Sequence, residues 1–234
     1  MEPHIVDLCT LLNKMGAKIA GIGTNNLKIT GVDKLKGVKY KIIGDYLEAG
    51  TFAIASLATG GHVKIRGINV DDLDSFLQKF IEIGGKYISG EEFLEILPPE
   101  NELSATKMLR TAVHPSFPTD LQAPFTVLLT QAKGVSKIFE TLFEGRLNYL
   151  FELEKMGAHV EFLNPHQALI IGPTKLKGVP ISSWDIRAGA GMVVAALIAE
   201  GTTEVSNINY IDRGYENFEG KFRALGANIQ RIAE

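Results

Sequence analysis

The stretch IRAGAGMVVAALIAEG, residues 186–201, is apolar on nearly every side when it is drawn as a helix. A helix of this kind has no polar face to turn to water, so it has to be buried. Two other stretches open in the same way, with Leu or Ile, a polar residue, Ala, and then Gly or Pro: LEAGTFAIASLATGG (47–61) and LQAPFTVLLTQAKG (121–134). The sequence therefore predicts three buried helices in equivalent places of three repeats.

A second repeated feature is a helix end that is closed by glycine and followed by a β-type stretch. It occurs in NKMGAKIAGI, IEIGGKYISG, EKMGAHVEFL and RALGANIQRI, at Gly16, Gly84, Gly157 and Gly226. Glycine ends helices because it adopts the left-handed backbone conformation without strain. The nearly constant spacing of the four glycines argues against four unrelated helix ends.

Each buried helix is followed by a stretch rich in Val, Ile and Phe, which predicts a strand. These stretches are HVKIRGI (62–68), VSKIFETLF (135–143) and TEVSNINYI (203–211). An amphipathic helix, a glycine turn and two short strands come next. One repeat is then strand–helix–strand–helix–strand–strand, which places the protein in the α/β (or α+β) class.

The chain opens with PHIVDLCTLLNKMGAK, an amphipathic helix whose buried partner does not precede it. Because a repeat needs its neighbour to bury its apolar face, we expect this sequence to be the C-terminal part of a longer protein. Residues 1–43 would be the tail of a preceding domain, and residues 44–234 one domain of three repeats. No Pro/Ser-rich linker marks the boundary near Gly44, which therefore rests on the repeat pattern alone.

The composition is that of an ordinary soluble protein, with 45% hydrophobic and 22% charged residues. The net charge of -3 gives no reason to expect nucleic acid or an anionic membrane as a partner. The first residues lack the features of a signal peptide, and a single cysteine, Cys9, suits a reducing compartment. We therefore expect a cytoplasmic protein, with Cys9 as a small core residue.

Charge changes between the repeats point to function. Two positions differ among the three repeats: the second residue of the buried helix and the residue thirteen places before the next glycine turn. In chain order the first position is Glu48, Gln122 and Arg187, and the second is Asp71, Glu144 and Arg213. Only the last repeat carries arginine at both places. A cation at a helix start is mildly unfavourable, yet the free N–H groups there favour an anion, which arginine grips with two bonds.

The simpler interpretation is that each arginine pairs with an aspartate beside it. Asp185 is a predicted N-cap before Arg187, and Asp212 directly precedes Arg213. Two arginines that break the pattern in one repeat nevertheless favour an anionic ligand. The five histidines show no metal-ligand spacing, and no metal site is expected: His4, His62, His114, His159 and His166.

The segment RTAVHPSFPTDLQ, residues 110–122, is irregular. Its prolines fix an extended path before the second buried helix, and Asp120 stands where that helix would be capped. A carboxylate on a stiff loop can also act as a base or bind sugar hydroxyls. The turn FEGR, residues 143–146, sets Glu144 beside Arg146, and an exposed ion pair is the simpler interpretation there.

Several of these segments together resemble the enolpyruvyl transferase family, in its UDP-N-acetylglucosamine 1-carboxyvinyltransferase branch. They are EPHIVDL, GDYLEAGTF, RTAVHPSFPTDLQA, FEGR, DIRAGAGMVVAALIAEGTT and IDRGYENFEGKFRALGA, and they extend over essentially the whole chain. HP-x-FPTD and IDRGYE distinguish this branch from the relative in the shikimate pathway. The resemblance implies an inside-out α/β barrel of three repeats with buried helices.

The resemblance also implies an activity: transfer of enolpyruvyl from phosphoenolpyruvate to the 3-hydroxyl of UDP-N-acetylglucosamine. This is the first committed step of cytoplasmic peptidoglycan synthesis, and so it belongs to cell wall biogenesis, cell shape and cell division. No metal or organic cofactor is implied. By motif, Arg187 and Arg213 would hold phosphoenolpyruvate, and Asp120 would contact the sugar as candidate base. The remaining site residues would be Leu142 and Phe143, lining the nucleotide-sugar site, with Glu144 and Arg146 in the catalytic network.

The sequence departs from the family in what it lacks. The family's N-terminal domain carries a Lys-Asn pair and a mobile loop with a reactive Cys or Asp, and Cys9 cannot replace that residue. Pro124 and the EGR of residues 144–146 also differ from the usual pattern. We therefore predict no transferase activity for this chain alone. The alternatives are a non-catalytic sugar-nucleotide or anion-binding module, a 3-phosphoshikimate enolpyruvyl transferase-like enzyme, or a structural fragment.

Overall fold

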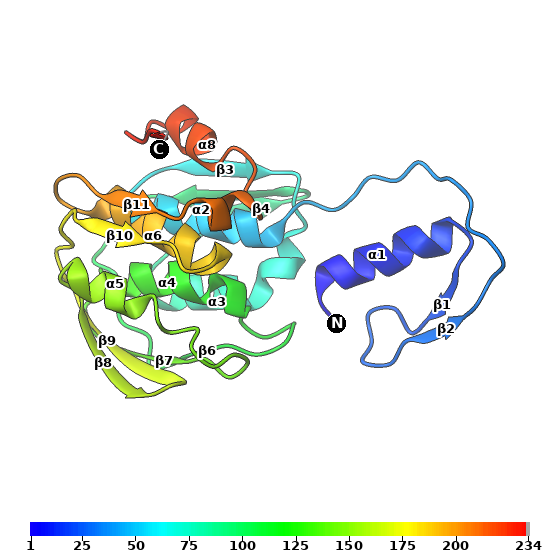
Figure 1. The fold of residues 1–234 in the computed structure, drawn as a ribbon, viewed down its shortest axis with the longest axis horizontal. Coiled ribbons are helices and arrows are strands. Elements are labelled where there is room, and N and C mark those ends of the chain that lie inside the picture. Colours follow the sequence, from blue (N-terminus) through cyan, green and yellow to red (C-terminus); the bar gives the residue numbers. More distant parts are fainter. Residues whose placement is uncertain (233–234) are drawn as a thin grey trace.

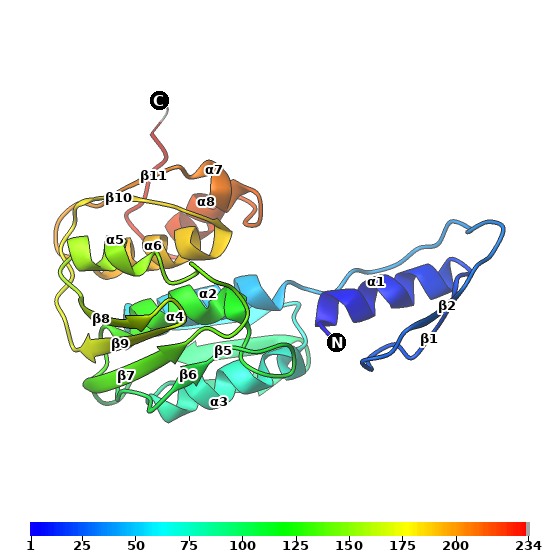
Figure 2. The ribbon, with the colours of Figure 1, turned by 60° about the horizontal axis from the view of Figure 1, so that its bottom comes forward.

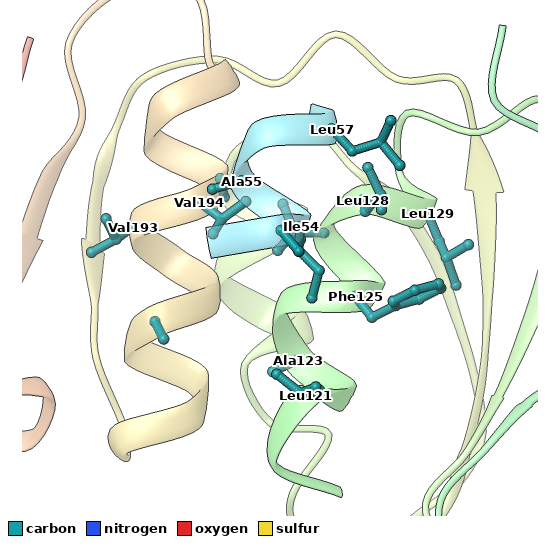
Figure 3. Packing of buried hydrophobic residues seen from close by; sticks show 14 of the residues in the cluster. Ile54, Ala55, Leu57, Leu121, Ala123, Phe125, Leu128, Leu129, Val193 and Val194 are labelled. Carbon is teal, nitrogen blue, oxygen red and sulfur yellow. The ribbon is translucent and has the colours of Figure 1, made fainter. Parts of the chain in front are cut away.

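Three helices pack against one another at the centre of the main body: α2 (Tyr46–Ala58), α4 (Gln122–Leu129) and α6 (Ile186–Ile198). The structure is a computed structural model that describes residues 1–232. Figure 3 shows Ile54 of α2, Phe125 of α4 and Val194 of α6 among the buried side chains of the core. All three side chains are fully buried, which confirms the predicted burial of the three apolar stretches.

Small residues let these helices approach closely. A Cβ on Gly191 of α6 would lie 3.2 Å from the backbone carbon of Ala123 in α4. A Cβ on Gly50 of α2 would lie 2.9 Å from Cδ2 of Leu121. Both distances are shorter than ordinary van der Waals contacts, so a larger residue at either position would require its neighbour to shift.

Two of the three helices are capped by an aspartate. Asp185 accepts hydrogen bonds from the N–H groups of Arg187 and Ala188, as expected, and Asp45, for which no cap was predicted, does the same at the start of α2. The expected cap at Asp120 was wrong, because Asp120 caps nothing. It lies inside a short 3-10 turn, η2 (Thr119–Leu121), which leads into α4 without a side-chain cap. Its carboxylate is therefore free to bond elsewhere.

The amphipathic helices are each followed by their glycine turn: α1 (Pro3–Lys14), α3 (Asp74–Glu82, after η1, Val70–Leu73), α5 (Leu150–Lys155) and α8 (Phe218–Ala224). Figure 2 shows α3, α5 and α8 on the outside of the main body. The four glycines, Gly16, Gly84, Gly157 and Gly226, have φ angles between 95° and 105°. The left-handed conformation predicted from the sequence is therefore confirmed at all four turns.

The strands of the main body form three sheets. One has the order β3-β5-β4 with antiparallel pairs, from β3 (Val63–Arg66), β4 (Lys86–Gly90) and β5 (Phe93–Leu97). The second has the order β6-β7-β9-β8, from β6 (Leu109–Arg110), β7 (Gly134–Phe139), β8 (His159–Asn164) and β9 (Gln167–Gly172). The third pairs β10 (Pro180–Ser182) with β11 (Glu204–Ser206) in parallel.

The middle repeat contains every predicted element in the predicted order, from β6 and α4 through β7 and α5 to the hairpin β8–β9. The last repeat differs from the prediction. The strand expected over residues 203–211 stops at Ser206, and α7 (Asn209–Asp212) follows as a short helix. Asn207 has a φ of 56°, which an extended strand cannot accommodate. The strand expected over residues 135–143 likewise ends at Phe139.

Residues 1–43 form a separate group of elements beside the main body, as Figure 1 shows. Helix α1 lies next to the antiparallel pair of β1 (Lys18–Ala20) and β2 (Lys28–Thr30), and an extended segment leads from there to α2. Cys9 is buried on α1, in line with its predicted place in a core. The domain division near Gly44 stays a prediction.

Within the described residues 1–232, no helix is long and apolar enough to cross a membrane. The same part of the chain holds no group of three His, Cys, Asp or Glu side chains placed to bind a metal ion.

Candidate active site

The Asp120 carboxylate stands at the centre of a cluster of charged side chains. Oδ1 accepts a hydrogen bond of 2.6 Å from Nε of Arg187, and Oδ2 accepts one of 3.2 Å from Nη2 of the same guanidinium. Arg146 adds a third bond, with Nη1 3.2 Å from Oδ1. The two-bond geometry of Arg187 is the strong, oriented form of an arginine–carboxylate pair. Three sequence-predicted site residues therefore meet at one point.

Helix packing brings these residues together. Asp120 leads into α4, Arg187 is in the first turn of α6, and α4 packs along α6. Asp185 accepts hydrogen bonds from the N–H groups of Arg187 and Ala188. Those amides are not free for an anion, so of the groups expected to bind one at this helix start only the guanidinium remains. Arg187 also pairs with Asp120 rather than with the neighbouring Asp185.

The pKa of Arg187 reflects two opposing influences. Partial burial alone would lower the pKa of its guanidinium. The hydrogen bonds and the charge of Asp120 outweigh burial and hold the pKa above its ordinary value. Arg187 therefore stays charged, and Asp120 is its fixed counter-ion.

A second carboxylate, that of Glu140, is hydrogen-bonded to the Asp120 cluster through Thr119. Glu140 is fully buried, and its Oε2 accepts a 2.7 Å hydrogen bond from the hydroxyl of Thr119. Nη1 of Arg146 donates to the same Thr119 oxygen at 2.6 Å, and the other Glu140 oxygen accepts the Leu142 N–H at 2.9 Å. A buried charge needs such partners. Glu140 thereby joins the turn that follows β7 to the turn that holds Asp120.

Glu140 and Thr119 were not predicted from the sequence as site residues. Both lie in quoted segments, PSFPTD and VSKIFETLF, and Glu140 is a lone acid in a largely apolar, strand-like run. This isolated acid could have indicated a structural or functional role, because a charged residue among buried apolar residues has to be paired. Its partner could not be named before the two segments were known to be adjacent.

The predicted pair of Glu144 with Arg146 does not form. Arg146 points inward to Asp120, its side chain is only 12% exposed, and its guanidinium carbon is 4.0 Å from the centre of the Phe143 ring. Glu144 is 86% exposed and reaches only His166, with Oε1 3.9 Å from Nε2. Leu142 and Phe143 are partly exposed beside this turn. Glu144 is thus outside the Asp120 cluster in this conformation.

Arg213 follows α7, and the next residue, Gly214, packs on the first residue of α6. A Cβ on Gly214 would lie 2.9 Å from Cγ2 of Ile186. Arg213 and Arg187 are therefore at the same end of α6. Asp212 does not pair with Arg213, so the simpler interpretation does not hold for this arginine. The Asp212 oxygens accept hydrogen bonds of 2.9 and 2.6 Å from Arg231, and the exposed Arg213 side chain is left facing outward.

Tyr215, in the quoted IDRGYE motif, is a further residue that the sequence analysis did not single out. Its hydroxyl is 2.8 Å from Oγ1 of Thr51 in α2. Burial, more than any other influence, raises the pKa of Tyr215. The tyrosine therefore remains neutral and ties the segment that carries Arg213 to α2.

A hollow of about 490 Å³ lies elsewhere, between α2, β3 and α8. Phe52, Ile65 and Leu225 supply part of its apolar lining, and Lys221 lies at its edge. It includes none of the three residues of the Asp120 cluster. The candidate site is therefore identified by the hydrogen bonds and charges of the Asp120 cluster and not by this hollow.

The sequence profile of the EPSP synthase (3-phosphoshikimate 1-carboxyvinyltransferase) family matches residues 1–222. The chain belongs to this family. Two curated relatives are UDP-N-acetylglucosamine 1-carboxyvinyltransferase 3 of Caldanaerobacter subterraneus subsp. tengcongensis, 47% identical over all of this chain, and the Clostridium botulinum UDP-N-acetylglucosamine 1-carboxyvinyltransferase, 44% identical over 99% of it. The chain spans 55% of the length of each, so about half of these EPSP synthase family members has no counterpart here.

Solved structures of the family share the fold. The enolpyruvyl transferase NikO from Streptomyces tendae superposes with a TM-score of 0.88 at 24% identity, over 98% of this chain and 55% of NikO. EPSP synthase from Acinetobacter baumannii superposes with a TM-score of 0.73 at 17% identity, over 95% of this chain and 54% of that protein. The predicted α/β fold of enolpyruvyl transferase type is therefore confirmed.

Proposed function

We propose that this chain is part of an enzyme that transfers enolpyruvyl from phosphoenolpyruvate to the 3-hydroxyl of UDP-N-acetylglucosamine. The observation that supports this best is the Asp120 cluster, because it joins HPSFPTD, FEGR and DIRAG, three segments that carry the family resemblance. The relatives at 44–47% identity are named for this activity. The 3-phosphoshikimate alternative has weaker support, since the EPSP synthase from Acinetobacter baumannii is only 17% identical.

In this proposal Asp120 receives the sugar. Its carboxylate is held by two arginines and can accept a hydrogen bond, or the proton, of an attacking hydroxyl. Leu142 and Phe143 present partly exposed apolar surface beside Arg146 and suit the nucleotide end of the substrate. Glu144 would have to turn inward to join the catalytic network, which its exposure permits.

Arg187 and Arg213 receive phosphoenolpyruvate, which brings a carboxylate and a phosphate. Both residues lie at the N-terminal end of α6, and Arg213 is exposed there. A guanidinium grips either anionic group with two parallel bonds. Because Asp120 already occupies the fork of Arg187, an incoming anion would have to share or displace that carboxylate.

The complete reaction would need the part of the relatives that this chain does not span, and the chain alone would not turn over. Residues 44–234 would form the domain that holds the half-site described here, and residues 1–43 the tail of the domain that completes it. The same proposal places the protein in the cytoplasm, in peptidoglycan synthesis, and hence in cell wall biogenesis, cell shape and cell division.

Calorimetric titration tests this proposal. UDP-N-acetylglucosamine is expected to bind the purified chain, and Asp120→Ala is expected to weaken binding at least tenfold, because a charged hydrogen-bond partner of the sugar is lost. Asp71→Ala, at an acid that bonds to neither Asp120 nor its arginines, serves as the matched control and should bind as the native chain does. Preferential binding of shikimate 3-phosphate, or equal affinity of the two variants, would contradict the assignment.

A further inference from the structure

Glu2 makes an unusual set of contacts for a residue at a helix start. It occupies the N-cap position of α1, but its side chain does not cap that helix. Instead Oε1 accepts the backbone N–H of His114 at 2.9 Å, and Oε2 accepts the hydroxyl of Tyr46 at 3.2 Å. One carboxylate thus links three places that are far apart in the sequence: α1, the first residue of α2 and the loop before Asp120.

These two bonds are most of the side-chain hydrogen bonding between residues 1–43 and the main body in the described residues. In the part of the chain that the structure describes, three side-chain hydrogen bonds cross from one to the other, and Glu2 makes two of them. The third joins Lys41 to Glu92, whose side chains are 79% and 64% exposed. An exposed ion pair contributes little to stability. Glu2 is therefore the principal polar link.

The loop that Glu2 holds leads directly to Asp120. Its far end is anchored in the core by Phe117, whose ring is 5.3 Å from that of Phe125 in α4. Its near end, at His114, has the Glu2 carboxylate as the acceptor for its amide. Because His114 and Phe117 are both held, the segment between them is fixed at both ends, three residues before Asp120.

Tyr46 supplies a rigid support for the carboxylate. Its ring is buried at the first turn of α2, and only its hydroxyl reaches toward Glu2. Burial first, and then the negative charge of Glu2, raise the pKa of Tyr46, so that it remains a hydrogen-bond donor throughout the ordinary pH range. The carboxylate is therefore held on a fixed donor of the core while it accepts the loop amide.

We propose that Glu2 is a positioning residue, whose carboxylate clasps the His114 loop to α2 and so sets the approach to Asp120. The chain segment before the main body thereby takes part in shaping the candidate site. An effect of this clasp on sugar binding rests on the proposed function. The hydrogen bonds of Glu2 that form the clasp do not depend on it.

Amide hydrogen exchange measured by NMR on the whole chain tests the clasp. In Glu2→Ala the His114 amide is expected to exchange roughly ten times faster or more, because it loses a charged acceptor. Amides of α4 should keep their native rates. Glu2→Gln retains one acceptor oxygen and should restore much of the His114 protection. Glu92→Ala, which removes the third link, is the matched control and should leave His114 unchanged.

Two results would overturn the proposal. An unchanged His114 rate in Glu2→Ala would show that the carboxylate does not hold the loop. Equal acceleration of His114 and of the α4 amides would show general destabilisation rather than positioning.

A parallel titration separates the clasp from the proposed function. UDP-N-acetylglucosamine should bind Glu2→Ala several-fold more weakly than Glu92→Ala, and equal affinities would contradict the link between the clasp and the site. If no form of the chain binds this sugar nucleotide, the proposed function fails, while the exchange rates still decide the clasp.

Discussion

At the scale of single residues, Arg187 and the aspartate beside Arg213 form ion pairs with residues that are distant in the sequence. The guanidinium of Arg187 bonds to Asp120 and not to Asp185, which accepts only backbone N–H groups there. Asp212 bonds to Arg231 and not to its neighbour Arg213. The sequence singled out Arg187 and Arg213 as candidate site residues, because their charges break the repeat, and their role stays a prediction. The sequence could not predict the pairing, since partners such as Asp120 and Arg187 are brought together only by helix packing.

Arg231 provides a direct measure of such a pairing. Its hydrogen bonds are the main cause that holds the pKa of Asp212 below its ordinary value. In Arg231→Gln the Asp212 pKa should rise toward the ordinary aspartate range near 4. The pair's contribution to stability is present above that range and is lost as the pH falls through the lowered pKa.

A pH titration of the Asp212 carboxyl carbon by NMR makes this measurement. Arg223→Gln, on the neighbouring helix α8, should leave the Asp212 pKa where it is, since Arg223 donates to the Ile229 carbonyl instead. A pKa of Asp212 that is equally low with and without Arg231 would show that the pair does not exist in solution.

At the scale of helices and strands, three buried helices determine where the site residues lie. Phe125 of α4 is fully buried, with its ring 5.9 Å from that of Phe76 and 5.3 Å from that of Phe117. Phe76 comes from the outer helix α3, and Phe117 from the loop before Asp120. The same side chain therefore joins the inner helix, the outer helix and the site loop.

Phe125→Ala should lower the free energy of unfolding by about 3–5 kcal/mol, as expected for emptying a closely packed core position. Phe151→Ala is the matched control, because Phe151 is half exposed and stacks only on Phe162, at 4.7 Å. Its loss should stay below about 1.5 kcal/mol, the worth of an aromatic pair beyond its burial. Denaturant unfolding gives both values, and similar losses for the two variants would contradict the packing described.

Several elements could be predicted from the sequence for identifiable reasons. The buried helices followed from apolar runs, and the glycine turns at Gly16, Gly84, Gly157 and Gly226 from a residue with a special backbone role. The prediction was wrong where a single residue changed the local conformation. Asn207, with its positive φ, ends β11 and lets α7 form where continued Ile and Tyr content indicated a strand.

At the scale of the whole molecule, the repeat is the reason that the candidate site exists. Equivalent helices meet at the centre, so the residues at their starts come close even when the sequence separates them widely. The middle repeat is complete, with four strands in its sheet, whereas the sheets of the other two have three and two strands in the described residues. The three residues of the Asp120 cluster come from the last two repeats, and Glu2 bonds to the loop before Asp120 from the segment before the first repeat.

The central claim is that Asp120, Arg146 and Arg187 form one site for a sugar nucleotide. The most direct test follows backbone amide signals of the labelled chain while UDP-N-acetylglucosamine is added. The account predicts that the largest shifts fall on residues 119–121, 142–146 and 186–188 and that they are lost in Asp120→Ala. Shifts concentrated instead on the hollow between α2, β3 and α8, or none at saturating ligand, would contradict it.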